Sequence, residues 1–161
     1  MMVLVDTCIW SLALRRRERT DDPEVRELET LIRDGRVQLI GPIRQEILSG
    51  IARKAQFDRV WRSLAAFTDL LIEAEDYELA ASYYNLCRSK GIQGSNTDFL
   101  ICAVGARHQH EIYTTDADFE RFARCLPIVL HLAQASPLPS AEALEQAETP
   151  WRRSATHVRA S

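Results

Sequence analysis

The sequence has no long hydrophobic run and little excess charge of either sign. None of its apolar stretches approaches the roughly 20 residues that a membrane-spanning helix needs. The net charge is −3, so the chain as a whole does not attract nucleic acid by charge, and any polyanion must be met locally. The opening residues, MMVLVDTC, lack a basic segment and reach an acid at Asp6. We therefore expect a buried strand there and no secretory signal.

Cysteine and histidine are also scarce, with four residues of each type. The cysteines form no C-x-x-C pair and lie in or beside apolar runs, so neither a zinc knuckle nor a disulfide framework is expected. The close histidine pair, His108 and His110, has an i to i+2 spacing that does not place both rings on one helix face. A reducing cytoplasm is the compartment that fits this chain best.

The remaining composition is that of an ordinary globular protein. Hydrophobic residues make up 46% of the 161 residues and charged residues 27%, which excludes disordered and fibrous classes. The segment 136–161 differs, because it holds three of the six prolines and has almost no aliphatic periodicity. We expect one domain over residues 1–135 and a mobile C-terminal tail over 136–161.

Buried strands and helices alternate along the domain. The segment 22–35 is the clearest helix, since Asp22 is placed to cap it, Pro23 takes the first helical position and Gly35 ends it. Further helices are predicted at 7–14, 42–51, 54–67, 76–91, 96–109 and 118–124, of which 96–109 should be the most buried. Strands are predicted at 2–5, 37–41, 111–115 and 127–132, with a short apolar stretch at 70–74. This order predicts an α/β fold with a central parallel sheet of about five strands.

Four acids fall at or near the carboxyl ends of these strands. Asp6 follows the first strand, Glu46 comes early in the helix after the second, Asp98 lies in the first turn of the most buried helix, and Asp116 follows the strand 111–115. Ligands of open parallel sheets bind outside this edge. If the four acids meet there, their repulsion amounts to up to several kcal/mol per close pair unless a cation neutralises it.

Each acid also has a simpler interpretation. Asp6 is placed to cap the first helix, and SNTD at 95–98 and TDAD at 115–118 both match a capping pattern. Glu46 lies beside an apolar helical stripe and could simply border it. A cap contributes only about 1 kcal/mol, so capping alone does not explain four acids at one place.

The segments that carry these acids resemble the PIN-domain family, and within it the VapC-type toxin ribonucleases of toxin–antitoxin pairs. The resemblance rests on VLVDT at the start, IRQEIL around Glu46, NTDFLICAVG around Asp98 and YTTDADF at the close, and it covers roughly residues 2–130. The order and spacing of the four segments carry the resemblance more than any one of them does.

The resemblance implies a three-layer α/β/α fold and a carboxylate cluster that binds Mg²⁺ or Mn²⁺ and cuts RNA. It also implies a cognate antitoxin as partner and a homodimer formed through helical faces. By motif position, the acids Asp6, Glu46, Asp98 and Asp116 match the family's acidic set, Asp118 its additional acid, and Thr7 and Thr114 its supporting hydroxyls. Cys8 departs from the pattern, since a small polar residue often follows D-T in the family.

The residue types agree with such a metal site. Oxygen ligands suit Mg²⁺ or Mn²⁺, which keep several waters and use few carboxylates, whereas zinc would favour histidine or cysteine. Basic residues would then only position the RNA, and the candidates are Arg15, Arg16, Arg17 and Arg44. A solvated helix end is the simpler interpretation of these charges.

The two aspartates of TDAD are expected to have unequal roles. Asp116, directly after the strand, should be the metal ligand, with Thr114 on the same side of the strand to hold a carboxylate or a metal-bound water. Asp118, inside the first helical turn, should be a helix cap that can also contact a second ion.

Three other interpretations remain open from the sequence. A phosphoacceptor receiver domain would require a late lysine after a strand, and no lysine occurs beyond Lys90. A non-catalytic PIN-like scaffold or RNA-binding module would be expected to lack one of the acids. A structure-specific DNA nuclease usually carries additional acids and inserted segments.

Overall fold

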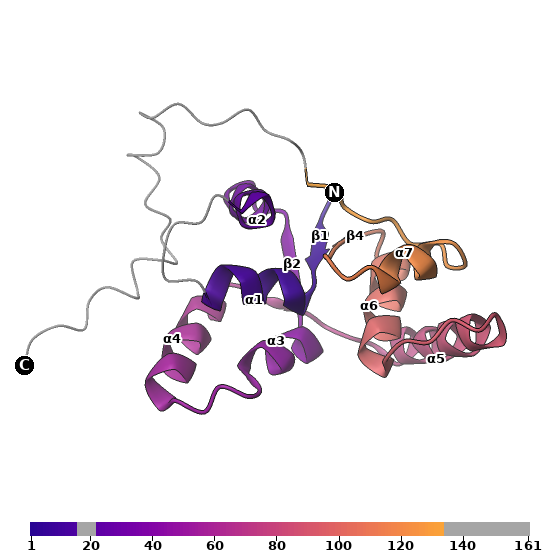
Figure 1. The fold of residues 1–161 in the computed structure, drawn as a ribbon, viewed down its shortest axis with the longest axis horizontal. Coiled ribbons are helices and arrows are strands. Elements are labelled where there is room, and N and C mark those ends of the chain that lie inside the picture. Colours follow the sequence, from indigo (N-terminus) through magenta and orange to yellow (C-terminus); the bar gives the residue numbers. More distant parts are fainter. Residues whose placement is uncertain (16–21, 134–161) are drawn as a thin grey trace, which may run out of the picture.

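The computed structural model describes residues 1–15 and 22–133, so the expected tail at 136–161 lies outside the described residues. Along the described chain, the elements are β1 (Val3–Val5), α1 (Thr7–Arg15), α2 (Pro23–Arg33), β2 (Val37–Ile40), α3 (Gly41–Leu48), α4 (Lys54–Leu64), β3 (Asp69–Leu70), α5 (Ala74–Ser89), α6 (Asn96–Arg107), β4 (Glu111–Tyr113) and α7 (Asp118–Ala123) (Figure 1). None of the helices in these described ranges is long and apolar enough to span a bilayer.

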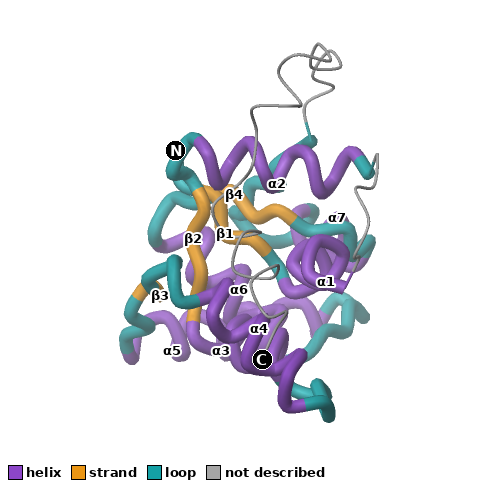
Figure 2. Tube along the Cα trace, turned by 90° about the vertical axis from the view of Figure 1, so that its left-hand side faces the viewer, coloured by secondary structure: helices purple, strands orange, loops and turns teal. Residues whose placement is uncertain are grey.

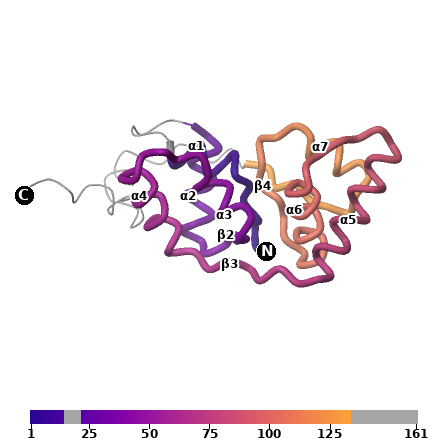
Figure 3. The backbone as a smooth tube through the Cα atoms, turned by 90° about the horizontal axis from the view of Figure 1, so that it is seen from below, coloured from indigo at the N-terminus to yellow at the C-terminus, as the bar shows by residue number. Residues whose placement is uncertain are grey.

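The four strands form one parallel sheet in the order β3-β2-β1-β4. β1 is a central strand, and its residues Val3, Leu4 and Val5 are fully buried. Helices enclose the strands in Figure 2, and Figure 3 shows α1, α2 and α4 on one side of them and α5, α6 and α7 on the other. The predicted three-layer α/β/α fold is confirmed.

α6 is the helix most enclosed by the core, as its nearly apolar sequence predicts. Every residue from Phe99 to Gly105 is buried. A Cβ added at Gly105 would lie 2.9 Å from the Ile112 side chain, so the glycine lets α6 approach β4 closely. This packing fixes the start of α6, and with it Asp98, relative to the strands.

The predicted ends of α2 are also confirmed. Asp22 is the N-cap and its side chain accepts the backbone N–H of Glu24, while Pro23 takes the first helical position. Gly35 follows the helix with φ +65°, a conformation that glycine adopts without the steric penalty of a side chain.

The predicted strand at 127–132 is wrong in its extent. Within this segment only Leu130 forms a β-bridge, and its partner is Ile112 of β4. Ile112 donates its N–H to Val129 O, and its carbonyl accepts the N–H of His131. Successive residues of a strand direct their backbone groups to opposite neighbours, and Glu111 and Tyr113 are bonded to the β1 side. Within the three-residue β4, only Ile112 directs its backbone N–H and C=O away from β1, so only this residue can pair with a further strand. The sheet therefore has four strands where about five were expected.

The segment after α7 is instead held by a buried histidine. His131 Nδ1 lies 2.6 Å from Glu111 Oε2, and His131 Nε2 lies 2.7 Å from Glu27 Oε1. Both His131 and Glu27 are less than a tenth exposed. Side-chain contacts to α2 and β4 thus supply the attachment that backbone pairing does not.

Candidate active site at the carboxyl ends of the strands

Asp6 occupies the end of the central strand. Its backbone N–H donates to Tyr113 O at 2.9 Å, which extends the β1–β4 pairing by one step. One carboxylate oxygen, Oδ1, accepts from Thr7 N at 2.7 Å, and the other, Oδ2, accepts from Thr114 Oγ1 at 2.8 Å and from Cys8 Sγ at 3.3 Å. The side chain is therefore fixed from both α1 and the segment that follows β4.

Burial dominates the electrostatics of Asp6, which is only 8% exposed. Burial raises the pKa of its carboxyl group; the hydrogen bonds from Thr114, Cys8 and Thr7 lower it, and the nearby charge of Asp98 raises it again, so that the pKa stands above its ordinary value. An ionised Asp6 is thus held in surroundings where a cation would stabilise it.

Thr114 links Asp6 to Asp116. While Thr114 Oγ1 donates to Asp6, it accepts the backbone N–H of Asp116 at 3.0 Å. Asp116 Oδ1 in turn accepts the N–H of Asp118 at 2.9 Å. The hydroxyl of Thr114 therefore holds a carboxylate, as expected, and it also holds the backbone of the turn that carries Asp116.

The capping role proposed for Asp118 is wrong. The N-cap position of α7 is Ala117 and has no side-chain cap bond, and the acid that accepts a backbone N–H is Asp116. The carboxylate of Asp118 instead lies 3.4 Å from Arg121 Nη1, with both side chains well exposed. The turn is short enough that the earlier aspartate reaches the first N–H of the helix.

Glu46 joins this network through Thr7. Thr7 Oγ1 donates to Glu46 Oε2 at 2.8 Å, and the backbone N–H of the same threonine donates to Asp6. Glu46 is exposed, while Ile43 and Ile47 form the buried face of α3. α1 and α3 begin near one another at the carboxyl end of β1 (Figure 1), so a single threonine connects the two acids.

Asp98 combines a capping role with a place near Asp6. Its Oδ2 accepts from Ser95 N at 2.7 Å and its N–H donates to Ser95 Oγ at 3.1 Å, so the capping pattern of SNTD is confirmed. Its charge also raises the pKa of Asp6, and burial together with the charges of Asp98 and Asp6 raises the pKa of the Cys102 thiol. Capping and a place in the acidic site are therefore compatible.

Hydrogen bonds thus connect Glu46, Thr7, Asp6, Thr114 and Asp116 in one chain, and Asp98 lies near enough for its charge to act on Asp6. The acids do not form a closed cage, because within residues 1–15 and 22–133 no three histidine, cysteine, aspartate or glutamate side chains are placed to hold a metal ion. Mg²⁺ is often held by only one or two carboxylates together with waters and phosphate oxygens. The donor types fit such an ion.

Of the basic residues expected to position RNA, only the side chain of Arg44 lies within the described part of the chain. Arg16 and Arg17 lie outside the described residues, and the side chain of Arg15 is not described either. The guanidinium of Arg44 binds both carboxylate oxygens of Asp69 and the backbone carbonyls of Leu64 and Phe67. These contacts join α3 to the segment between α4 and β3, and we predict from them that Arg44 serves the fold rather than RNA binding.

Cys8, which the sequence marks only as a departure from the family's pattern and which was therefore expected to weaken the hydrogen bonding of this turn, contacts the site. Its sulfur lies 3.3 Å from Asp6 Oδ2, from Thr114 Oγ1 and from Thr115 N. The available signal was its position two residues after Asp6, inside the first turn of α1.

A model of the PIN domain matches residues 3–124, a span that contains every acid of this site. The chain belongs to the PIN domain family. The VapC ribonuclease Mb1587 of Mycobacterium bovis is 33% identical over 125 residues, which cover 76% of this chain and 92% of that protein. Ribonuclease VapC11 of Mycobacterium tuberculosis matches to the same extent. The resemblance to VapC-type PIN domains is confirmed, and the receiver-domain interpretation is set aside.

Solved structures agree with the PIN fold. The structure of VapBC2 from Rickettsia felis bound to a DNA fragment from their promoter aligns with a TM-score of 0.67 at 18% identity, covering 81% of this chain and 98% of that one. At this level of identity the likeness concerns the fold.

Proposed function

We propose that this PIN domain is a divalent-metal-dependent endoribonuclease, a VapC-like toxin that a cognate antitoxin neutralises. The observation that carries the proposal is the linkage of Glu46, Asp6 and Asp116 through Thr7 and Thr114 at one edge of the sheet, with Asp98 close by. The relatives named as VapC ribonucleases support the same activity. A cytoplasmic location remains a prediction.

The metal preference follows from the oxygen atoms available. Asp6, Asp98, Asp116 and Glu46 would hold Mg²⁺ or Mn²⁺, and Asp118, two residues after Asp116, would contact a second ion. When bound, such an ion lowers the pKa of a coordinated water and stabilises negative charge on the phosphodiester oxygens. Burial raises the pKa of Asp6, so a bound cation would stabilise its ionised form.

The two threonines have separate tasks. Thr7 donates its N–H to Asp6 and its hydroxyl to Glu46, and thereby sets the distance between these two acids. Thr114 donates to Asp6 and receives the Asp116 N–H, which orients the turn after β4. Outer partners of this kind orient metal ligands and are worth about 10- to 100-fold in metal affinity or activity.

The first experiment measures RNA cleavage by the purified chain with EDTA and then with added Mg²⁺ or Mn²⁺. The proposal expects cleavage only with the metal, and cleavage of single-stranded DNA should be much slower. An Asp98→Asn variant keeps an oxygen for the Ser95 cap and should be inactive, while Asp58→Asn, on the far surface of α4 beside Lys54, should be fully active. Cleavage that resists EDTA would show that the metal assignment is wrong.

The toxin assignment is tested separately in cells. Expression of the chain alone should slow growth, and co-expression of a small DNA-binding partner encoded beside it should restore growth. An Asp98→Asn chain should be harmless yet still bind that partner. If the wild-type chain is active on RNA in vitro but leaves growth unchanged, the protein is a ribonuclease without the proposed toxin role.

Two finer expectations belong to the same proposal. Exposed apolar side chains on α4 and α5, namely Phe57, Trp61, Tyr77 and Leu86, offer helical faces for a homodimer or a partner. Light scattering at tens of micromolar should therefore give the mass of a dimer, and a monomer would contradict it. A catalytically silent scaffold would show RNA binding without cleavage under every metal condition.

A further inference from the structure

Cys8 lies in the first turn of α1 and is only partly buried. Among the cysteines of the described residues, Cys87 and Cys102 are buried in the core. Cys125, also partly buried, bonds to the Arg121 carbonyl of its own helical turn at 3.7 Å. Cys8 thus differs from the others, since its sulfur contacts groups of the acidic site.

The sulfur of Cys8 has a donor role and an acceptor role. The backbone N–H of Thr115 donates to the sulfur at 3.3 Å, and the thiol donates to Asp6 Oδ2 at the same distance. Thr114 Oγ1, which donates to Asp6 Oδ2 and receives Asp116 N–H, also lies 3.3 Å from the Cys8 sulfur. The sulfur therefore joins the start of α1 directly to the loop between β4 and α7.

These contacts bear on the distance between two acids. Asp6 belongs to the end of β1, whereas Asp116 belongs to the loop after β4, and Thr114 is the other side chain that ties them together. Without Cys8, the Thr115 N–H would lose its acceptor and Asp6 Oδ2 would lose one of its donors. The loop could then shift Asp116 relative to Asp6 while the strands stayed in place.

We propose that Cys8 is a positioning residue that fixes the Asp116 turn against Asp6 and so sets the geometry of the metal-holding carboxylates. This inference rests on the proposed metal-dependent nuclease function. It assigns to the thiol the task of a hydrogen-bonding bridge and gives it no part in the chemical step.

The bridge suits sulfur better than oxygen. A serine oxygen lies closer to its Cβ than a sulfur does, and O–H···O bonds are shorter than about 3.0 Å. At a spacing set by 3.3 Å contacts, a serine could reach one of the two bonded partners well but not both. Cys8→Ser should therefore restore part of the function that Cys8→Ala loses.

The test compares Cys8→Ala, Cys8→Ser and the control Cys125→Ala in the full chain. Mn²⁺ binding is followed by electron paramagnetic resonance, which does not depend on activity, and RNA cleavage gives kcat and KM. Cys8→Ala should weaken Mn²⁺ binding by about three- to tenfold, the range for loss of one hydrogen bond. It should also lower kcat at limiting metal while leaving KM for RNA unchanged. The serine variant should fall between Cys8→Ala and wild type, and the control should match wild type.

A Cys8→Ala protein that is folded and binds Mn²⁺ as tightly as wild type would overturn the proposal. If the wild-type chain itself neither binds Mn²⁺ nor cleaves RNA, the proposed nuclease function fails first. Amide hydrogen exchange at Thr115 then still decides on the bridge, because it should accelerate by about three- to tenfold in Cys8→Ala and not in Cys125→Ala. Equal exchange rates in Cys8→Ala and wild type would show that the sulfur does not restrain the loop at Thr115.

Discussion

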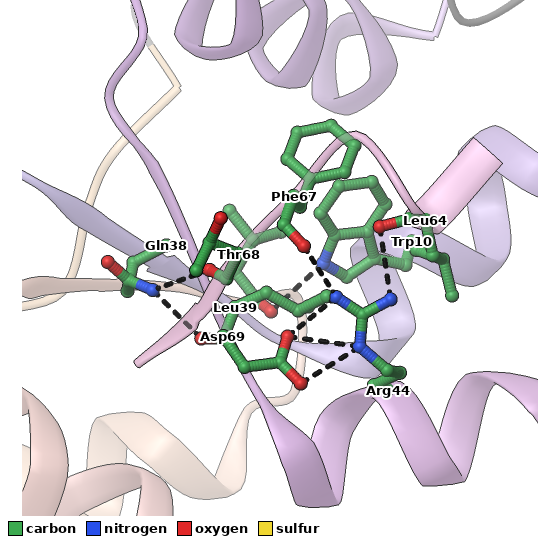
Figure 4. A network of polar contacts seen from close by, with 9 residues as sticks. Trp10, Gln38, Leu39, Arg44, Leu64, Phe67, Thr68 and Asp69 are labelled. Atoms are coloured by element: carbon green, nitrogen blue, oxygen red, sulfur yellow. Dashed lines mark hydrogen bonds and ion pairs between the residues drawn. The ribbon is translucent and has the colours of Figure 1, made fainter. Parts of the chain in front are cut away.

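Arg44 offers a sharp test of whether a basic residue serves the fold or the RNA. Its guanidinium contacts Asp69 through Nε at 2.9 and 3.0 Å and through Nη2 at 2.7 Å, and it donates to Phe67 O at 2.7 Å and Leu64 O at 3.0 Å. Figure 4 shows this group enclosed by the segment from Leu64 to Asp69. The informative change is Arg44→Met, which keeps most of the aliphatic stem and removes the donors.

The expected cost is about 2–4 kcal/mol. Hydrogen bonds to charged groups contribute about 1.5–3 kcal/mol each, but the Asp69 side chain is 30% exposed and water can replace part of what it loses. Arg44→Lys should cost somewhat less, because the ammonium keeps a charge beside Asp69, but it should still destabilise the fold since it cannot reproduce the planar fork. For a chain of this size, the loss for Arg44→Met lowers the melting temperature by roughly 4–16 °C.

Urea unfolding and calorimetry measure the stability, and Lys54→Met is the matched control. Lys54 pairs with Asp58 on the surface of α4 and is 87% exposed, so its loss should cost about 0.3–0.5 kcal/mol. RNA binding of the folded Arg44→Met protein should equal that of wild type. Unchanged stability combined with a clear loss of RNA affinity would refute the structural role and return Arg44 to the substrate-binding set.

Three further changes test other parts of the structure. Asp116→Asn should abolish metal-dependent cleavage and spare the fold, whereas Asp118→Asn should retain measurable activity in a Mn²⁺ titration; equal and complete loss in both would show that Asp118 is a full ligand. Burial acts to raise the pKa of Asp76, but the Glu73 N–H and the Arg107 guanidinium outweigh it and hold the pKa below its ordinary value. Ionised Asp76 therefore stabilises the fold above its ordinary pKa and loses this effect as the pH falls through the lower folded-state value, so wild type should exceed Asp76→Asn in unfolding free energy near pH 7, and this advantage should decline as the pH falls below the ordinary carboxyl pKa. A difference in unfolding free energy that stays constant as the pH falls would contradict a stabilising role for ionised Asp76. Gly94→Ala would place a Cβ 2.6 Å from the Phe122 ring just before α6, and should lower the unfolding free energy by about 1–3 kcal/mol; a neutral effect would show that the α6–α7 contact is loose.

Much of the fold could be predicted from the sequence, because local signals and burial agree. Asp22, Pro23 and Gly35 mark the ends of α2 by local stereochemistry alone, and the apolar run of α6 predicts its place in the core. The segment 127–132 has an equally strand-like composition, but whether it pairs depends on how many backbone groups β4 leaves free. The number of free backbone groups on β4 is set by how the strands pair in the sheet, and it cannot be predicted from the sequence of residues 127–132.

Some features of the site could likewise be predicted from the sequence, and others depend on the tertiary fold. The positions of Asp6 and Asp116 after strands predict that they share one edge, and the hydrogen bonds through Thr114 agree with this. The hydrogen bonds of Arg44 involve the backbone carbonyls of Leu64 and Phe67, which lie 20 and 23 residues away in the chain. Hydrophobic periodicity does not reveal such contacts. The contact of Cys8 with Thr114 spans 106 residues and is likewise a product of the tertiary fold.

The central claim is that the carboxylates at the strand ends hold the metal that cleaves RNA, and Asp6→Asn tests it most directly. Asparagine keeps the size of the side chain and an oxygen for the Thr7 N–H, but it removes the buried charge and replaces the oxygen that accepts from Thr114 and Cys8. Mn²⁺ affinity and RNA cleavage are measured on the same samples, and the melting temperature shows that the variant is folded. We expect both to fall by more than about a hundredfold, because the loss of even an outer partner of a metal ligand costs up to about that much. A folded Asp6→Asn protein that binds Mn²⁺ and cleaves RNA as wild type does would contradict the claim.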